Sequence, residues 1–268
     1  MAHTHLEKLE ALGRIIDTLD VLRVKCPWDK KQTNESLRPN TIEEVYELCD
    51  ALINNDTFNI KKELGDVLLH VLFYAKIAEE QGRFDIADVA DALNEKLIFR
   101  HPHVFGNLSV ENSHEVEQNW EQIKLKEKGG NKTVLSGVPN ALPSMIKANR
   151  IQEKVSNVGF DWEEPQQVWN KVKEECEEFE REINKMDKVK MEEEMGDLFF
   201  SLINVSRLYG INPENALEKT NKKFISRFNY LENKAKMLEK TLGEMSLEEM
   251  DMLWNEAKQF NNNNSLQA

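Results

Sequence analysis

EEVYELCDALINNDTFNIKKELGD, at residues 43–66, returns in altered form as EECEEFEREINKMDKVKMEEEMGD at residues 174–197. Five carboxylates keep one spacing in both stretches, 131 residues apart: Glu43, Glu44, Glu47, Glu63 and Asp66 in the first, and Glu174, Glu175, Glu178, Glu194 and Asp197 in the second. Chance does not readily give five acids a shared spacing. We infer an internal duplication, because self-similarity at a fixed offset indicates a repeated structural unit.

The repetition continues beyond the acids. Asn94, Lys96 and Arg100 recur as Asn221, Lys223 and Arg227, and Trp120 with Lys124 recurs as Trp254 with Lys258. Spacing is constant inside each group, whereas the offset changes between groups, as insertions and deletions in loops would produce. The repeated feature is therefore a site as well as a fold.

Composition favours a helical protein of two domains. The chain has 268 residues, of which 40% are hydrophobic and 31% charged, with only 11 glycines and 7 prolines. No segment alternates polar and apolar β-branched residues for long, so we expect essentially no sheet. The predicted fold class is all-α, with two tandem helical-bundle modules at 1–128 and 144–260, a turn-rich linker at 129–143 and a disordered tail at 261–268.

Net charge limits the possible partners. A formal charge of −13 argues against binding to a nucleic-acid polymer, which depends on Lys and Arg neutralising phosphates. The odd set of cysteines, Cys26, Cys49 and Cys176, and the lack of a signal-peptide pattern favour the cytoplasm. No apolar run approaches the roughly 18 residues that a membrane span needs.

Helical periodicity and capping residues predict ten helices. Thr41 is expected to begin the second helix, with Glu44 reaching back to it, because Pro39 resists continuing an earlier helix. In the first half, the expected helices cover 6–24, 60–80, 85–99 and 110–128, together with the second helix that starts at 41. In the second half, they cover 143–155, 165–184, 188–208, 213–242 and 246–260.

The acids fall on two adjacent helices of each half. Residues three apart share a helix face, so Glu175 and Glu178 form one pair and Glu194 and Asp197 another. An antiparallel hairpin would bring the two pairs together. Four carboxylates around one point need a cation, and oxygen ligands favour a hard ion such as Mg²⁺. Gly65 and Gly196, which precede the aspartates, suggest a close backbone approach.

Two other interpretations of the acids remain open at this point. They could be the solvated face of charged helices, although duplication at fixed spacing argues against this. A di-iron bundle would use Glu-x-x-His, but the third residue after Glu63 and after Glu194 is an aspartate. The nearby His70 is not repeated either, because Ser201 stands at the equivalent position of the second half.

The basic residues could hold phosphates that the metal does not reach, and Trp254 could stack on a base. Equally, Trp254 could be a core aromatic, and Lys223 and Arg227 could pair with surface acids.

With these motifs in place, the chain resembles the MazG family of all-α nucleoside triphosphate pyrophosphohydrolases. Glu174-Glu175-x-x-Glu178 followed by Glu194-Met195-Gly196-Asp197 is similar to the family's EExxE and ExxD motifs. The likeness covers nearly the whole length, including residues 26–33, 100–106 and 147–152.

The resemblance implies a homodimer that hydrolyses nucleoside triphosphates to the monophosphate and pyrophosphate with Mg²⁺, for which Mn²⁺ could substitute. It implies that the metal ligands are Glu175, Glu178, Glu194 and Asp197. The nucleotide-binding residues would be Lys171, Glu175, Lys190, Asp197, Lys223, Arg227, Trp254 and Lys258. Either Glu174 or Glu193 would position the attacking water.

The first half repeats this set with one departure. Its ligands would be Glu44, Glu47, Glu63 and Asp66, accompanied by Lys96, Arg100, Trp120 and Lys124. Asn59 stands where the second half has Lys190, which removes a phosphate-binding cation, so we expect the second half to be the main active site. The alternative functions are a nucleotide sensor or scaffold that does not cleave, and a hydrolase restricted to one nucleotide such as dUTP.

Overall fold

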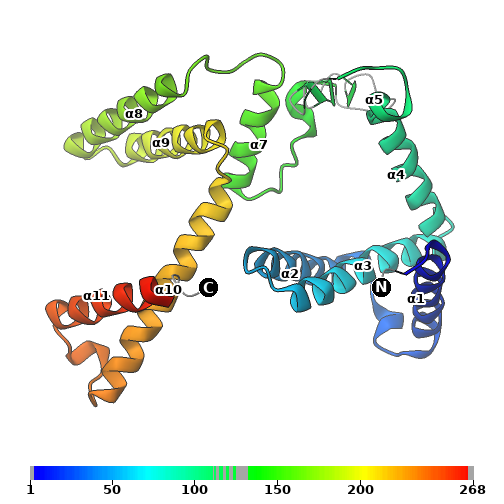
Figure 1. Cartoon of the computed structure of the whole chain (residues 1–268), viewed down its shortest axis with the longest axis horizontal. Coiled ribbons are helices and arrows are strands. Elements are labelled where there is room, and N and C mark those ends of the chain that lie inside the picture. The colour runs from blue at the N-terminus through cyan, green and yellow to red at the C-terminus, as the bar shows by residue number, and fades with distance from the viewer. Residues whose placement is uncertain are drawn as a thin grey trace. The chain divides into compact units, whose positions relative to one another are not determined.

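A computed structural model describes residues 3–110, 112, 115, 116, 119, 120, 123, 124 and 132–264. Helices form all the regular structure of these residues, without a strand among them, so the predicted all-α class is confirmed (Figure 1). The chain divides into two units, Met1–Glu111 and Asn112–Ala268. The predicted linker at 129–143 lies partly outside the described residues and stays a prediction.

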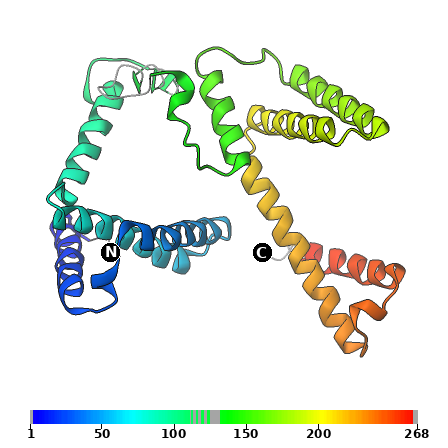
Figure 2. The same ribbon diagram turned by 180° about the vertical axis from the view of Figure 1, so that it is seen from behind.

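The first unit is built around a helical hairpin. Its helices are α1 (His5–Lys25), α2 (Asn34–Ile53), α3 (Thr57–Glu80), α4 (Ile86–Arg100) and the short α5 (Pro102–Phe105), with a 3₁₀ turn at Asp29–Lys31. Helices α2 and α3 run side by side in opposite directions (Figures 1 and 2). The side chains of Asp56 and Asp85 cap α3 and α4, respectively, because each accepts hydrogen bonds from backbone N–H groups in the first turn of its helix.

The core of this unit joins α1 to the hairpin. Its buried members are Leu19, Leu37, Leu72, Phe73 and Ile77, each at most 5% exposed. These residues come from α1, α2 and α3, so their burial fixes the position of α1 on the hairpin.

The predicted start of α2 at Thr41 is wrong. The helix begins seven residues earlier at Asn34, because Thr33 and Ser36 form a capping box and Leu37 is buried in the core. Pro39 lies inside the helix and lacks one backbone donor, a cost that the cap and the burial offset. The Thr41 hydroxyl donates to the Leu37 carbonyl oxygen at 3.0 Å instead of capping.

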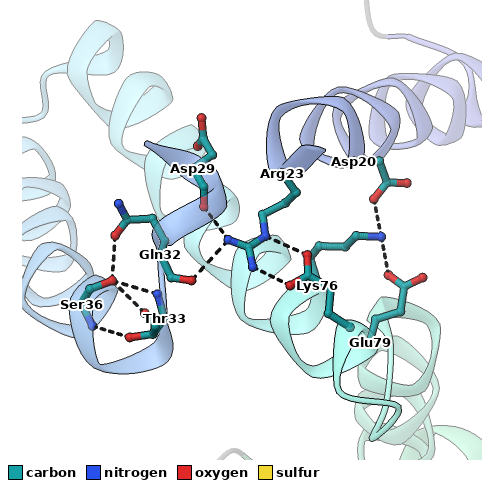
Figure 3. Close-up of polar contacts among 9 residues, drawn as sticks. Asp20, Arg23, Asp29, Gln32, Thr33, Ser36, Lys76 and Glu79 are labelled. Carbon is teal, nitrogen blue, oxygen red and sulfur yellow. Dashed lines mark hydrogen bonds and ion pairs between the residues drawn. The ribbon is translucent and has the colours of Figure 1, made fainter. Parts of the chain in front are cut away.

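An arginine anchors the turn between α1 and α2 (Figure 3). The Arg23 side chain is 7% exposed and donates from Nε to Glu80 at 2.8 Å, and its Nη1 donates to the carbonyl oxygens of Asp29 and Gln32. Beside it, Lys76 pairs with Asp20 at 2.7 Å. These contacts link α1, the 3₁₀ turn and α3.

The second unit repeats the hairpin and extends it. Its helices are α7 (Ser144–Ser156), α8 (Pro165–Lys185), α9 (Lys188–Leu208), α10 (Pro213–Met237) and α11 (Leu247–Asn264), with 3₁₀ turns at Val134–Gly137 and Leu242–Glu244. Helices α8 and α9 form the hairpin, and α11 packs against α10 (Figure 1). A second core of Leu231, Ala235, Met245 and Leu253 joins α10 and α11.

Most predicted helices of the second half are confirmed, with differences near the C-terminus. Helix α10 ends at Met237 rather than at residue 242, because Leu238 begins a turn and Glu239 takes a left-handed conformation with φ of 55°. Helix α11 continues to Asn264, so residues 261–264 of the predicted disordered tail are helical, while 265–268 lie outside the described residues.

The helix predicted at 110–128 falls mostly outside the described residues, although Trp120 and Lys124 are described and helical. No helix in the described parts of the chain combines the length and apolar character that a bilayer crossing requires.

Candidate metal and nucleotide site

The tight turn between α8 and α9 sets the acids opposite one another. Met186 ends α8 in a left-handed conformation with φ of 57°, and the Asp187 side chain accepts a hydrogen bond from the Lys190 backbone N–H to begin α9. The chain reverses over these two residues. Glu175 on α8 therefore faces Glu194 and Asp197 on α9.

Three carboxylates meet in each hairpin. Oxygens of Glu175, Glu194 and Asp197 all lie within 4.8 Å of one another, and those of Glu44, Glu63 and Asp66 do the same in the first unit. Glu175 is 5% exposed and Glu63 is 4% exposed. We call these sets the second and first acidic groups.

The fourth predicted ligand of each set lies outside these groups. Glu178 accepts a hydrogen bond from Arg181 at 3.0 Å, and Glu47 lies 3.8 Å from the Lys62 ammonium. Both are still close enough to act electrostatically on the groups. Their assignment as metal ligands stays a prediction.

Desolvation, and then crowding of like charge, disfavours ionisation of one glutamate in each group. Desolvation raises the pKa of Glu194, and the negative charges of Glu178 and Glu175 raise it further. Desolvation and the charge of Asp66 raise the pKa of Glu44 in the same way. A bound cation would relieve this repulsion.

Each group also contacts a lysine, and the two lysines come from different helices. Lys62 on α3 lies 2.8 Å from Glu63 and 3.8 Å from both Glu47 and Asp66. Lys171 on α8 lies 2.8 Å from Glu174 and 2.8 Å from Glu175. Hydrogen bonds to Glu63 and to Glu174, respectively, are the main causes that raise the pKa values of Lys62 and Lys171.

The donor atoms fit a hard divalent ion. Both groups found in the described part of the chain contain only carboxylates, which suit Mg²⁺ or Mn²⁺ rather than zinc or copper. Glu63 Oε2 is buried without a hydrogen-bond partner, which leaves an acceptor inside the first group. His70 instead bonds through Nδ1 to the Thr41 hydroxyl at 3.0 Å, which gives the di-iron interpretation no support.

Two of the predicted nucleotide-binding residues of α10 and α11, Arg227 and Trp254, lie against each other. The Trp254 ring lies 4.9 Å from the Phe224 ring and 5.9 Å from the Arg227 guanidinium, and it packs against the core of these two helices. Lys258 donates to Asn255, and Lys223 is exposed. The acids, in contrast, lie on α8 and α9.

The remaining predicted residues are distributed around the hairpins. Lys190 and Glu193 are exposed on α9, and Glu174 pairs with Lys171. In the first unit, Lys96 and Arg100 lie on α4. The roles of these residues stay predictions.

The repeated sequence pattern did not identify Lys62. A lysine four residues before Asp66 on one helix face was the available signal, since residues at this spacing are neighbours. It also missed Asn204 and Arg207, which line a cavity beside the second acidic group, because both lie beyond the repeated motifs.

A duplicated helical hairpin with clustered carboxylates defines a class of all-α proteins suited to holding a divalent cation. The sequence pattern of the MazG nucleotide pyrophosphohydrolase domain matches residues 32–105 and 163–231, once over each hairpin. The chain belongs to the MazG family.

Three relatives are similar to this chain along most of its length. The chain is 47% identical over 234 residues to the nucleoside triphosphate pyrophosphohydrolase/pyrophosphatase MazG of Thermotoga maritima, covering 87% of this chain and 89% of that protein. It is 44% identical over 259 residues to the nucleoside triphosphate pyrophosphohydrolase of Escherichia coli, covering 94% and 98%. It is also 48% identical over 236 residues to the uncharacterized protein YabN of Bacillus subtilis, covering 87% and 48%.

Proposed function

We propose that this protein hydrolyses nucleoside triphosphates to the monophosphate and pyrophosphate, with Mg²⁺ or Mn²⁺ held by the acidic groups. The observation that carries the proposal is a group of three carboxylates in each hairpin. In both groups, the carboxylate oxygens lie within 4.8 Å of one another. So much negative charge is costly without a cation, and a triphosphate itself needs one. The names of the Thermotoga and Escherichia relatives support the same reaction.

The carboxylates of Glu175, Glu194 and Asp197 would hold the metal in the second unit, with Glu178 at the edge. When bound, the ion supplies positive charge that stabilises the phosphate oxygens in the transition state. Lys171 and Lys190 contribute cations to the phosphates that the ion does not contact. Glu174 or Glu193 orients the attacking water, and pyrophosphate leaves.

The second unit is the main active site in this proposal. Lys190 lies in the first turn of α9, whereas the corresponding Asn59 of the first unit carries no charge and donates to Asp56 at 2.7 Å. Lys62 also extends across three acids of the first hairpin. Both features weaken the first site for a triphosphate.

We also propose a homodimer in the cytoplasm. Helix α9 exposes several apolar side chains in the single chain, among them Phe199 at 56% and Leu202 at 39%. Contiguous exposed apolar surface on a helical hairpin favours burial against a second copy. All three cysteines are free thiols, which suits a reducing compartment.

The products of ATP turnover test the reaction. With Mg²⁺, we expect AMP and pyrophosphate. Asp197→Asn should lower the rate by at least about a hundredfold, since it removes one charge from the cation-binding group and leaves the helix intact. Asp66→Asn is the matched variant in the first unit and should retain most activity.

ADP with phosphate as products would demand a different reaction. Binding of ATP without any product would favour the sensor function instead. An Asp197→Asn variant as active as the natural chain, together with an inactive Asp66→Asn variant, would move the active site to the first unit.

A further inference from the structure

A second cavity, of about 500 Å³, opens on the first hairpin where α2 approaches the turn into α3. We call it the turn pocket. Five carboxylates line it: Glu43, Glu47, Asp50, Asp56 and Glu63. Among the described residues of its lining, none is a lysine or an arginine. Of the three members of the first acidic group, only Glu63 lines the turn pocket, so the two sites overlap at one residue.

Three of these acids form a row along α2. Glu43, Glu47 and Asp50 are four and three residues apart, so they share one face of the helix. At a rise of about 1.5 Å per residue, the row extends over about 10 Å. A divalent ion contacts its oxygen ligands at roughly 2.0–2.6 Å and therefore cannot bridge both ends of the row. An elongated ligand with several separated positive charges can.

Glu63 adds a buried acceptor to the pocket from α3. The residue is 4% exposed, and its Oε2 atom is buried without a hydrogen-bond partner in the described part of the chain. Its Oε1 atom accepts from Lys62 at 2.8 Å. Leaving a buried carboxylate oxygen without a donor is costly, so the pocket favours a ligand that carries both N–H groups and positive charge.

The remaining lining suits the hydrocarbon part of an organic cation. Tyr46 is 53% exposed and offers an aromatic face, over which an ammonium group binds favourably. Ala51 is buried and adds an apolar contact. Two asparagines complete the lining without adding charge: Asn54 donates to Asp50 at 3.2 Å, and Asn59 donates to Asp56 at 2.7 Å.

The second hairpin differs at the equivalent surface. The offset of 131 residues holds through the turn, because α3 and α9 begin at equivalent residues, Thr57 and Lys188. Cations of the second hairpin stand at three lining positions of the turn pocket: Arg181 for Asp50, Lys185 for Asn54 and Lys190 for Asn59. Two of these cations pair with glutamates of α8. The second unit therefore compensates the charge of this surface, whereas the first leaves it acidic.

We propose that the turn pocket binds a linear polyamine, whose ammonium groups are separated by short methylene chains. The ammonium groups pair with the row of acids on α2 and donate to Glu63 Oε2, while the methylene groups pack against Tyr46 and Ala51. The same acids repel a triphosphate. The first unit thus takes a ligand opposite in charge to the substrate of the second, a function beyond the proposed hydrolysis.

Calorimetric titration of the full chain with spermidine tests this site. The buffer lacks magnesium, which would compete for Glu63, and its ionic strength is fixed, because salt screens exposed charges. Asp50→Arg introduces the cation that the second hairpin has at this position. It should weaken spermidine binding at least about tenfold, since it replaces an attraction by a repulsion. The helix should persist, because a cation near the C-terminus of α2 suits the helix dipole.

Asp17→Arg is the matched control, because it changes the net charge equally at an exposed position of α1 that does not line the pocket. Its effect on spermidine affinity should stay below about twofold. Asn54→Lys adds a cation without removing an acid and should weaken spermidine binding as well. Asp197→Asn, in the second hairpin, should leave spermidine affinity unchanged.

Three results would overturn the polyamine site. The first is a natural chain that does not bind spermidine. The second is equal weakening by Asp50→Arg and Asp17→Arg, which would show general attraction to an acidic protein. The third is loss of affinity in Asp197→Asn but not in Asp50→Arg, which would place the spermidine in the second hairpin.

Discussion

A single buried arginine shows how much one residue contributes to the first unit. Arg23 joins α1 to Glu80 at the end of α3 and to two carbonyl oxygens of the following turn, and its guanidinium lies 5.4 Å from the Phe73 ring centroid. The hydrogen bond from Arg23 lowers the pKa of Glu80. The stability of this unit should therefore depend on the charge of Glu80.

Glu80→Gln should lower the free energy of unfolding by about 1–2 kcal/mol at neutral pH. This loss of stability is smaller than the loss expected for a fully buried ion pair, because the Glu80 side chain is 39% exposed. Since the folded pKa lies below the ordinary value of 4.5, the stabilisation is present above that pH and is lost as the pH falls through the folded pKa. Denaturant titrations at pH 7 and at pH 3 measure the difference.

Glu79→Gln serves as the control, because Glu79 is 52% exposed and its partner Lys76 keeps a second bond to Asp20. Its effect should stay within about 0.5 kcal/mol. A Glu80→Gln penalty that is equally large at pH 3 would show that the ion pair is not its cause.

Single residues were the hardest features to predict from the sequence. Spacing on adjacent helices predicted that Glu175, Glu194 and Asp197 would face one another, since only a short turn separates them. The contacts of Arg23, 57 residues away from Glu80, have no local pattern. Which lysine enters each acidic group depends on side-chain direction, which periodicity alone does not give.

At the level of elements, the hairpin of α8 and α9 was predictable because both ends of its turn carry clear signals. Pro165 begins α8, and α9 has the predicted bounds of Lys188–Leu208. The start of α2 was not predictable in the same way. There, a capping box and the burial of Leu37 outweigh Pro39, and burial depends on contacts distant in sequence.

The glycines of the hairpins contradict one expectation. We expected a close backbone approach at Gly65 and Gly196. A Cβ atom placed at either glycine, however, would have no heavy atom of the described chain within 4 Å, once the neighbouring residues of its own helix are left out. The described part of the chain therefore supplies no steric reason for these glycines. The approach of a second copy or of the substrate at this point is open to test.

Gly196→Ala should raise the free energy of unfolding by about 1 kcal/mol, because alanine favours the helix over glycine. If a second copy or substrate approaches this point, turnover should fall while the thermal melting temperature rises. Gly65→Ala is the matched change in the first hairpin and should stabilise without affecting turnover. Loss of stability in Gly196→Ala would show that the helix geometry itself requires glycine.

On the scale of the whole molecule, the internal duplication was visible in the sequence, whereas the differences between its copies were not. The repeated acids predicted two similar hairpins, and both are present. The substitution of Phe73 for Asn204 at equivalent positions has structural meaning only once the first is found in a core and the second beside a cavity.

Association of two copies can be tested on the exposed apolar surface of α9. Light scattering coupled to size exclusion should give twice the chain mass of 31.2 kDa. Phe199→Asp should shift the protein toward the monomer, because it would bury a charge in the proposed interface. Phe160→Asp, at a side chain 79% exposed outside α9, is the control and should remain dimeric. A natural chain that elutes as a monomer at micromolar concentration contradicts the proposed homodimer.

Lys62 and Lys171 would make the proposed cation binding an exchange rather than a simple addition. Under the proposed function, an incoming ion would compete with an ammonium that already contacts the acids. Lys62 contacts two acids of the first group, whereas Lys171 contacts only Glu175 of the second. The two copies thus differ in their ammonium contacts, and if both groups bind Mg²⁺ as proposed, we expect one magnesium concentration to fill them to different extents.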